Sequence, residues 1–222
     1  MQPGSEPQFI LRYFNIVGRA EASRLLLTAG KASWTEENPE WPAAKADQPF
    51  GRLPVLVERT SGRDDWILSE SHTIERYLAR TFNLLPTDLK QAAEQEQMAD
   101  QEADVVNAFF MQVQASGDHK QRLVDEFNAL FARMVAEHMR ILGKNQSKAH
   151  LFGDALTYGD IGFYVFYKLF TLFLGTYQSD IAEITKAKVP AELVELIASI
   201  EKEPLLAAHL EKCDSVAAFL SA

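Results

Sequence analysis

The chain has 222 residues, of which 47% are hydrophobic and 24% charged, and its formal net charge is −9. This composition is typical of a soluble globular protein with room for one large or two small domains. The acidic balance argues against nucleic acid as a partner, because binding by counterion release needs a basic surface. Residues 1–86 are nearly neutral, with 10 Lys/Arg against 11 Asp/Glu, so this part is the better place to hold a small anion.

Targeting and metal signals are weak. The first residues, MQPGSEPQF, lack a basic region followed by an apolar core, so we expect a flexible tail at 1–7 rather than a signal peptide. The apolar stretch 161–175 is short and contains a lysine, which favours a buried helix over a membrane span. The single cysteine, Cys213, fits a reducing, cytoplasmic compartment. The five histidines show no metal-ligand spacing, so we expect no metal.

The prolines divide the chain in two. Six of the nine lie in residues 1–54, a seventh is Pro86, and none follows for about a hundred residues. A long proline-free span favours long helices. We therefore predict a first domain at 1–83, a linker at 84–90 and an all-helical domain at 91–222.

The first domain is predicted to be a small α/β domain. Alternating apolar residues indicate strands, helical spacing indicates helices, and prolines with a glycine indicate a loop. In chain order the predicted elements are a strand at 8–14, a helix at 19–29, a strand at 33–37, an irregular loop at 38–52, strands at 53–58 and 65–69, and a helix from Ser71. This order, β-α-β followed by β-β-α, is typical of a thioredoxin-like domain.

The second domain is predicted to be all helix. In chain order we expect helices at 90–115 and 119–142, an aromatic-rich helix after Thr157, short helices at 191–201 and 205–212, and an amphipathic turn to Leu220. Thr157 and Asp160 stand at capping-box spacing, where an oxygen at each end can satisfy free amides at the start of a helix. The aromatic run that follows them is interpreted as buried core.

The turn after the first strand holds the first candidate for chemistry. In α/β folds, ligands bind at the carboxyl ends of strands, and Tyr13 stands there with Arg19 at the start of the next helix. Thiol exchange on a thioredoxin-like domain needs a cysteine at this turn, and the turn has none. If a thiol takes part, it comes from the ligand, and the Tyr13 hydroxyl can donate to its thiolate. A purely structural strand-end aromatic is the alternative.

Two further segments offer backbone groups to a ligand. A cis Leu53-Pro54 bond before a strand would leave the Leu53 N–H and C=O free for an extended ligand. Glu70 and Ser71 open a helix whose free amides form an anion site, with Ser71 as cap and ligand donor. An ordinary N-cap explains these two residues equally well. The loop between the segments carries Trp41, Lys45 and Arg52.

Five motifs match the cytosolic glutathione transferases in order, and the chain most resembles their sigma class, which includes glutathione-dependent prostaglandin D synthases. The motifs are YFN-x-x-GRAE at 13–21, W-x-x-x-K at 41–45, PFGRLPVL at 49–56, L-S-E-S-x-x-I-x-R-Y-L-A at 68–79, and Thr157-x-x-Asp160 after Gly153-Asp154. The resemblance covers nearly the whole chain. It implies a thioredoxin-like domain, an all-helical domain and a two-fold homodimer.

The resemblance also implies residue roles. Tyr13 would stabilise the glutathione thiolate, and Arg19 would lie near the thiol and tune it. The other glutathione contacts would be the Leu53 backbone beside cis-Pro54, Glu70 and Ser71 at the γ-glutamyl end, Trp41, Lys45 and Arg52 at the glycine end, and Asp104 across the dimer. The second-substrate pocket would be lined by Phe14, Val17, Val106, Phe110 and Tyr158.

Three positions depart from the sigma pattern. Glu70 stands where Gln is common and keeps an acceptor for the ligand amine. Arg52 replaces a common Lys and keeps the charge, though not its geometry. Val17 stands where basic or small residues are frequent, which changes the wall of the second pocket.

The leading interpretation is an enzyme, a glutathione S-transferase that conjugates its co-substrate glutathione to small hydrophobic electrophiles, as in detoxification. An isomerase of the prostaglandin-synthase type, which does not consume glutathione, and a non-catalytic carrier on the same fold are the alternatives. Neither nucleic acid nor a membrane is an expected partner. Asp100 and Asp104 stand four apart on one helix face, but a solvated acidic face explains them as well as a metal does, so no metal is assigned.

Overall fold

The computed structural model describes residues 7–176 and 189–213. Its contacts divide the chain into two compact units, one formed by residues 1–85 with the segment from Glu203 onward, the other by Pro86–Lys202. We call these the first unit and the second unit. The segment from Glu203, which the sequence analysis grouped with the helical domain, is grouped by its contacts with the first unit. The predicted amphipathic turn to Leu220 lies outside the described residues.

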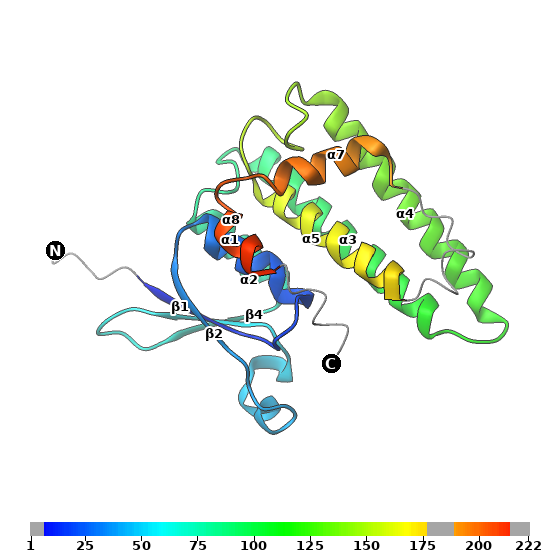
Figure 1. Cartoon of the computed structure of the whole chain (residues 1–222). Helices are drawn as coiled ribbons and strands as arrows, with labels where there is room; N and C mark the ends of the chain where they lie inside the picture. The colour runs from blue at the N-terminus through cyan, green and yellow to red at the C-terminus, as the bar shows by residue number, and fades with distance from the viewer. Residues whose placement is uncertain (1–6, 177–188, 214–222) are drawn as a thin grey trace. The chain divides into compact units, whose positions relative to one another are not determined.

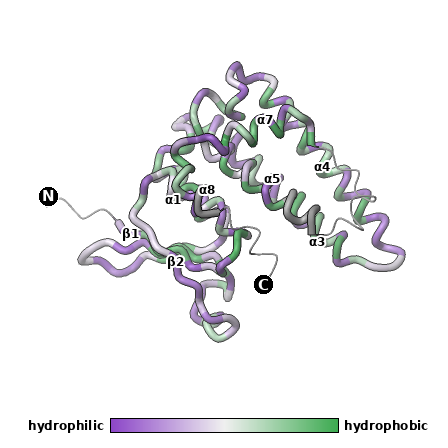
Figure 2. The backbone as a smooth tube through the Cα atoms, in the orientation of Figure 1, coloured by the Kyte–Doolittle hydropathy of each residue, from purple (hydrophilic) through white to green (hydrophobic). Residues whose placement is uncertain are grey.

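A four-stranded sheet in the order β2-β1-β3-β4 organises the first unit (Figure 1). Its strands are β1 (Gln8–Arg12), β2 (Ser33–Glu37), β3 (Val55–Arg59) and β4 (Trp66–Ser69). β1 runs parallel to β2 and antiparallel to β3, and β3 runs antiparallel to β4. Three successive residues are buried in each central strand, β1 and β3, which shows that both faces of the sheet centre are covered. Figure 2 shows that the centre of the sheet is apolar and that the loops around it are hydrophilic.

Two helices of this unit position the residues at the edge of the sheet. A 3₁₀ turn, η1 (Gly18–Ala20), leads into α1 (Glu21–Ala29), and α2 (Ser71–Thr81) follows β4. All but one residue of α1 is buried, and this helix contacts both α2 and the short helix α8 (Ala207–Cys213). The loop predicted to be irregular contains two 3₁₀ turns, η2 (Ala43–Asp47) and η3 (Pro49–Gly51). That prediction was wrong because proline, which fixes φ near −65°, is compatible with short 3₁₀ turns.

The second unit is built from long helices, as predicted. Among the described residues, the long helices are α3 (Leu89–Gln114), α4 (His119–Lys144) and α5 (Tyr158–Thr176), and α7 (Ala191–Ile200) corresponds to the short helix predicted at 191–201. Their core is aromatic, with the rings of Phe109 on α3 and Phe127 on α4 packed edge to face at 5.7 Å. Phe166 adds a ring from α5 to the same cluster. Within the described ranges, no helix combines the length and apolarity that a membrane crossing needs.

Asp160 anchors the start of α5. Its carboxylate is fully buried and accepts hydrogen bonds from the Leu151 amide at 2.7 Å, the Thr157 amide at 2.9 Å and the Thr157 hydroxyl at 2.6 Å. Burial raises the pKa of Asp160, and these bonds from Thr157 and Leu151 oppose the rise. The carboxylate thus ties the preceding loop to the first turn of the helix, which extends the predicted capping box by one partner.

Replacing Asp160 with alanine is expected to lower the free energy of unfolding by about 3 kcal/mol, because the Leu151 and Thr157 amides lose their acceptor inside the protein. Denaturant unfolding followed by circular dichroism measures the change. Asp154→Ala is the control, since Asp154 is an exposed acid on the same loop, and it should change the free energy by less than about 0.5 kcal/mol. Equal losses in the two variants would contradict the anchoring role.

Candidate active site

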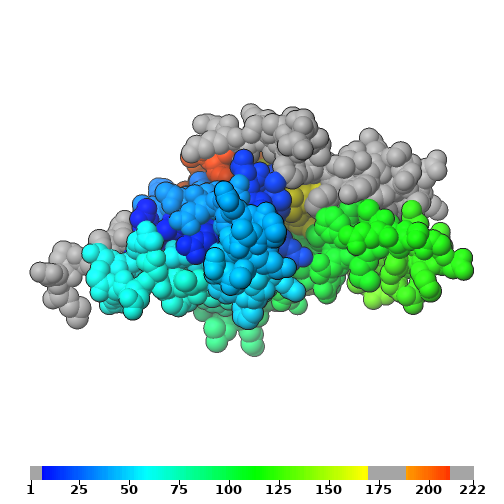
Figure 3. Space-filling model, turned by 90° about the horizontal axis from the view of Figure 1, so that it is seen from below, coloured from blue at the N-terminus to red at the C-terminus, as the bar shows by residue number. Residues whose placement is uncertain are grey.

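A cavity of about 420 Å³ opens in the first unit where the turn after β1, the loop before β3 and the start of α2 meet. It is lined by nine residues that the sequence singled out, namely Phe14, Arg19, Trp41, Lys45, Arg52, Leu53, Pro54, Glu70 and Ser71. Gly51 and Ser69 complete the lining. Figure 3 shows the surface from the side on which residues of the 38–52 loop project, coloured mid-blue. Residues from three separate segments therefore share one opening.

Tyr13 follows β1, on the turn that contributes Phe14 and Arg19 to the cavity. Its side chain is 7% exposed and does not line the cavity, whereas its neighbours Phe14 and Arg19 do. The Tyr13 hydroxyl oxygen accepts a hydrogen bond from the Arg19 amide at 3.0 Å. A phenol that accepts this bond keeps its own proton available for donation to an anion. The catalytic role of Tyr13 and the tuning role of Arg19 stay predictions.

Gly18 provides the space that the Tyr13 hydroxyl occupies. Its φ is +46°, and a Cβ at this position would lie 2.5 Å from the Tyr13 Oη. We expect Gly18→Ala to displace the hydroxyl and to lower kcat/KM for conjugation about tenfold, because misplacing a catalytic group costs transition-state stabilisation. The control is Gly62→Ala, where φ is +76° but a Cβ meets nothing within 4 Å. Similar activity losses in both variants would point to backbone strain rather than to the hydroxyl.

Arg24, which the sequence analysis missed, supports the turn from below. Its buried guanidinium donates through Nη1 to the Ile16 carbonyl at 2.9 Å and the Val17 carbonyl at 3.0 Å, and through Nη2 to the Phe14 carbonyl at 3.4 Å. The same guanidinium lies 5.8 Å from the centre of the Tyr13 ring. One side chain thus satisfies three carbonyls of the turn that presents the candidate catalytic residues.

Two carboxylates balance the charge of Arg24. Glu21 accepts from its Nη1 at 2.9 Å, and Glu36 on β2 accepts from its Nε at 2.7 Å. Burial lowers the pKa of Arg24, but the hydrogen bond to Glu36 and the charge of Glu21 outweigh that effect and leave the pKa above its ordinary value. Glu21 also contacts His209 of α8 at 2.7 Å. The sequence did contain a sign of the Glu21–Arg24 ion pair, because the two residues stand three apart on a predicted helix and are flanked by apolar residues.

Leu53 presents free backbone groups to the cavity. The Leu53-Pro54 peptide bond is cis, as expected. Pairing of β3 with its neighbours begins at Val55, and among the described residues no partner is found for the Leu53 N–H or C=O. An extended peptide can pair with such groups as an added strand does.

The start of α2 offers a second set of polar groups. Glu70 precedes the helix with φ at +72°, a conformation rare for a residue other than glycine. Ser71 is the first residue of the helix, so the prediction that it caps the helix was wrong, and the Glu70 side chain makes no capping bond either. Nearby, the Ser69 hydroxyl is buried without a hydrogen-bond partner among the described residues. Free amides, two hydroxyls and a carboxylate therefore meet at a helix N-terminus, which favours an anionic group.

The cavity carries an excess of positive charge. Arg19, Lys45 and Arg52 are exposed, and none forms an ion pair within the described part of the chain. Glu70 is the single acid among the lining residues. Trp41 holds its ring edge to face with Phe14 at 5.5 Å, which joins the 38–52 loop to the turn after β1. These groups suit a ligand with more carboxylates than amines.

The remaining predicted residues lie elsewhere. Val17 is half-buried on the turn after β1 and does not line the cavity. Asp104, Val106 and Phe110 lie on α3 of the second unit, where Asp104 is exposed and the other two pack against the aromatic core. Tyr158 is fully buried. The second-substrate role of these residues and the glutathione role of Asp104 stay predictions. Among the described residues, no group of three or more His, Cys, Asp or Glu side chains could hold a metal ion.

Comparisons with known proteins agree with this geometry. The models of the glutathione S-transferase N-terminal and C-terminal domains match residues 10–80 and 99–213. Probable glutathione S-transferase 6 of Caenorhabditis elegans is 34% identical over 159 residues, which cover 68% of this chain and 74% of the relative. Hematopoietic prostaglandin D synthase of Gallus gallus is 28% identical over 211 residues, covering 93% and 96%. The structure of a Fasciola hepatica sigma class transferase has a TM-score of 0.73 at 24% identity, covering 94% and 97%.

The thioredoxin-like unit followed by a helical unit corresponds to the matched N-terminal and C-terminal domains of the glutathione S-transferases. The chain belongs to the glutathione S-transferase family. It is an enzyme whose co-substrate is glutathione, and the predicted fold class, thioredoxin-like followed by all-helical, is confirmed.

Proposed function

We propose that the enzyme conjugates glutathione to small hydrophobic electrophiles and that Tyr13 stabilises the reacting thiolate. The observation that carries this proposal is that one cavity brings together a helix N-terminus with backbone groups and cations that have no partner within the described part of the chain. Glutathione has a carboxylate and an ammonium at its γ-glutamyl end, a peptide backbone in the middle and a carboxylate at its glycine end. The cavity offers a complementary group to each of these parts.

The tripeptide binds with its γ-glutamyl end at the start of α2. Glu70 accepts from the ammonium, while Ser71 and the first amides of α2 bind the carboxylate. The Leu53 backbone pairs with the cysteinyl residue. At the glycine end, Lys45 and Arg52 attract the second carboxylate, and Trp41 packs beside it. This orientation directs the sulfur toward the turn that carries Tyr13.

The chemistry requires that the thiol be ionised near neutral pH. A free thiol has a pKa of about 8.5, and a hydrogen bond donated by Tyr13 to the thiolate lowers it. The thiol proton leaves to solvent, the sulfur attacks the electrophilic carbon, a C–S bond forms and the leaving group departs with its electron pair. Phe14 and Val17, with Val106, Phe110 and Tyr158 of the second unit, supply the apolar surface for the electrophile.

An isomerase activity is the second candidate. It is favoured by the prostaglandin D synthase of Gallus gallus, whose similarity extends over 93% of this chain. An isomerase of this type uses the same thiolate, but the sulfur is released again at the end of the cycle. The two activities differ in the fate of glutathione, and a non-catalytic carrier would show binding without either reaction.

The sigma class, a homodimer and a cytoplasmic location are parts of the same proposal. The Fasciola hepatica structure supports the sigma class through its fold. Phe50 supports a dimer, because its ring is 78% exposed and a left-handed backbone with φ at +55° holds it away from the first unit. Cys213, the single cysteine, supports a reducing compartment. Sedimentation equilibrium tests the dimer, and a monomer at micromolar concentration would contradict it.

The decisive experiment mixes the full chain with glutathione and an activated aryl halide and follows both reactants. Loss of one glutathione per product supports conjugation. Turnover of a prostaglandin endoperoxide without glutathione loss, in the absence of conjugation, would select the isomerase. Retention on immobilised glutathione with neither reaction would select the carrier, and failure to bind glutathione would overturn all three.

A further inference from the structure

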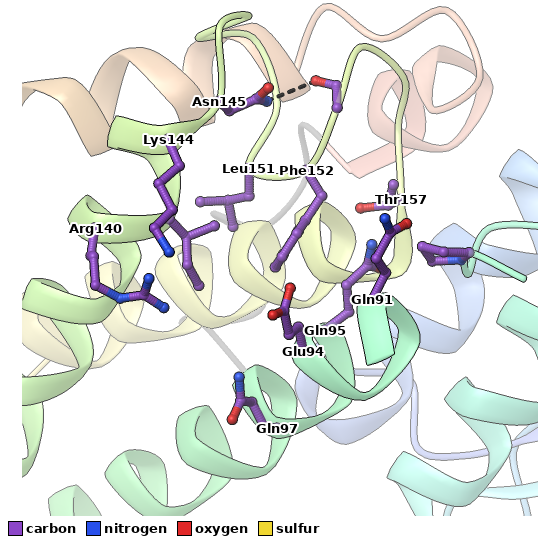
Figure 4. Close-up of a pocket in the computed structure, with 13 residues that line it drawn as sticks. Gln91, Glu94, Gln95, Gln97, Arg140, Lys144, Asn145, Leu151, Phe152 and Thr157 are labelled. Atoms are coloured by element: carbon purple, nitrogen blue, oxygen red, sulfur yellow. Dashed lines mark hydrogen bonds between the residues drawn. The ribbon is translucent and has the colours of Figure 1, made fainter. Parts of the chain in front are cut away.

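A cavity of about 460 Å³ lies in the second unit, between the first turns of α3, the last turns of α4 and the loop before α5 (Figure 4). Gln95 lines it, but its Oε1 accepts from the Gly159 amide at 3.1 Å and its Nε2 is buried. The charged residues around the opening are exposed, namely Glu94, Arg140 and Lys144. This cavity shares no lining residue with the cavity of the first unit. The groups that support the turn after β1 lie instead within the first unit.

His209 joins α8 to the support of this turn. It belongs to the segment from Glu203 that is grouped with the first unit, and its side chain is 10% exposed. Its Nε2 lies 2.7 Å from Oε1 of Glu21 on α1, 188 residues earlier in the chain. The turn before α8 is anchored by the fully buried Leu206, whose carbonyl accepts from the His209 amide at 3.0 Å. The imidazole therefore extends from a fixed point of the backbone toward α1.

Glu21 is the acceptor in this contact. Burial raises the pKa of Glu21, but the hydrogen bond and the charge of His209, together with Arg24, outweigh burial and leave the pKa below its ordinary value. An ionised carboxylate can only accept hydrogen bonds, so the Nε2 of His209 is the donor. The two oxygens of Glu21 are thus divided between two partners, since Oε1 accepts from His209 and Oε2 accepts from Arg24 Nη1 at 2.9 Å.

Arg24 connects this carboxylate to the turn. The same Nη1 donates to the carbonyls of Ile16 and Val17, at 2.9 Å and 3.0 Å. Two residues after Val17, the Arg19 amide donates to the Tyr13 hydroxyl at 3.0 Å. A series of short polar contacts and one short stretch of backbone therefore lead from α8 to the oxygen of the candidate catalytic residue.

The donor on α8 decides how the Arg24 guanidinium is shared. Its Nη1 already serves two carbonyls and Glu21, and its Nε donates to Glu36 at 2.7 Å. If Glu21 Oε1 lost its donor, this buried carboxylate would draw the guanidinium toward itself. The hydrogen bonds from Nη1 to the two carbonyls would then lengthen. A change at α8 is thereby expected to loosen the turn after β1.

We propose that His209 is a positioning residue for the reaction: it holds the Glu21 carboxylate so that Arg24 can fix the turn that presents Tyr13. This inference rests on the function proposed above, and it adds a residue from α8 to the groups that the reaction depends on. His209 does not line the cavity, so it acts through Glu21 and Arg24 rather than on the ligand.

Hydrogen exchange in the protein without glutathione tests the positioning directly. His209→Leu removes the donor, and the Arg19 amide is expected to exchange at least about fivefold faster, because its acceptor is less well held. The amides of β1 are the internal reference and should keep their rates. In His209→Gln the side-chain nitrogen is as many bonds from Cβ as the histidine Nε2, so this variant should return the Arg19 rate to within about twofold of the parent.

The same variants are compared in the conjugation assay. His209→Leu is expected to lower kcat/KM about fivefold and to raise the pKa of the bound thiol, while the KM for glutathione stays within about twofold. His209→Gln should recover most of the loss. The matched control is His119→Leu, because His119 is an exposed histidine at the start of α4 in the second unit, and its replacement should change neither quantity. Circular dichroism confirms that each variant is folded.

A double variant tests the route through Glu21. In a Glu21→Gln background the carboxylate is absent, so His209→Leu should have little further effect on kcat/KM or on Arg19 exchange. Additive losses in the double variant would show that His209 does not act through Glu21, which would overturn the proposal.

The exchange data separate this inference from the proposed function. Unchanged Arg19 exchange in folded His209→Leu, an equal increase in the β1 amides, or equal effects of the Leu and Gln variants would overturn the role of His209, even if the parent enzyme conjugates glutathione. If Arg19 exchange responds as expected but the parent enzyme does not lower the thiol pKa, the proposed role of Tyr13 fails and the support of the turn by His209 stands.

Discussion

Tyr13→Phe is expected to lower kcat/KM for glutathione conjugation about 100-fold while leaving the fold and glutathione binding nearly unchanged. In the proposed mechanism the hydroxyl stabilises the developing charge, and loss of one such donor costs a factor of about 10² to 10³. Among the described residues this oxygen accepts a hydrogen bond from the Arg19 amide, so its removal leaves that one N–H without this acceptor. The apparent pKa of the bound thiol should rise toward its free value, and the ultraviolet absorbance of the thiolate as a function of pH measures it.

A second phenol in the first unit provides the control. Tyr77 lies on α2 and donates its hydroxyl to Glu58, and burial, together with this hydrogen bond, raises its pKa to about 12. It does not line the cavity, so Tyr77→Phe should leave turnover and the thiol pKa as they are. If Tyr13→Phe turned over as fast as the parent enzyme, another group would have to hold the thiolate, and the Arg19 side chain would become the first candidate.

Arg24→Met is expected to lower the free energy of unfolding by about 3–5 kcal/mol, because it removes the buried positive charge that pairs with Glu36 and, together with His209, with Glu21. The carbonyls of Ile16 and Val17 lose the hydrogen bonds from Arg24 at the same time, whereas the Phe14 carbonyl still accepts from the Ile16 amide at 2.7 Å. The melting temperature of the 222-residue chain should fall by roughly 10 °C. Below the transition, kcat/KM should fall about tenfold, since the turn beside the sulfur is no longer held in place. Calorimetry and steady-state kinetics measure the two effects.

The same substitution at Arg59 shows what an exposed pair contributes. Arg59 pairs with Asp65 at 2.8 Å, but the two side chains are 50% and 36% exposed. Exposed pairs contribute about 0–1 kcal/mol, so Arg59→Met should change the melting temperature by no more than roughly 3 °C. Comparable destabilisation in the two variants would show that the buried ion pairs of Arg24 contribute no more to the free energy of unfolding than the exposed Arg59–Asp65 pair does.

The helices and strands were predictable because each carries its own periodicity. The predicted strand at 33–37 matches β2, and the predicted helix at 119–142 falls within α4 (His119–Lys144). Predictions failed where a local signal has two outcomes. The first helix begins as a 3₁₀ turn at Gly18, and the proline-rich loop folds into two 3₁₀ turns. The sequence did not reveal these turns because a short 3₁₀ turn does not change the hydrophobic pattern.

Part of the site was also predictable. Three of the chosen residues come from different motifs: Trp41 from a loop, Leu53 from the residues before a strand, and Glu70 from the start of a helix. They line one cavity because these segments meet at one edge of the sheet. Arg24 was not found. A periodicity argument counts apolar positions, and it gives no sign that Glu36, twelve residues away on β2, pairs with an arginine on a buried helix.

The sequence by itself determined the two-part architecture, the position of the candidate site and the absence of a cysteine from the first turn, because these follow from local pattern and residue identity. The tertiary structure decided which polar groups are paired and which are free. Gln95 and Gly159 are 64 residues apart, and their bond alone sets which end of the amide stays unpaired. The Arg19 amide likewise engages the Tyr13 hydroxyl because Gly18 leaves room for it. Pairing of this kind depends on distances across the fold and on backbone angles, neither of which a local pattern contains.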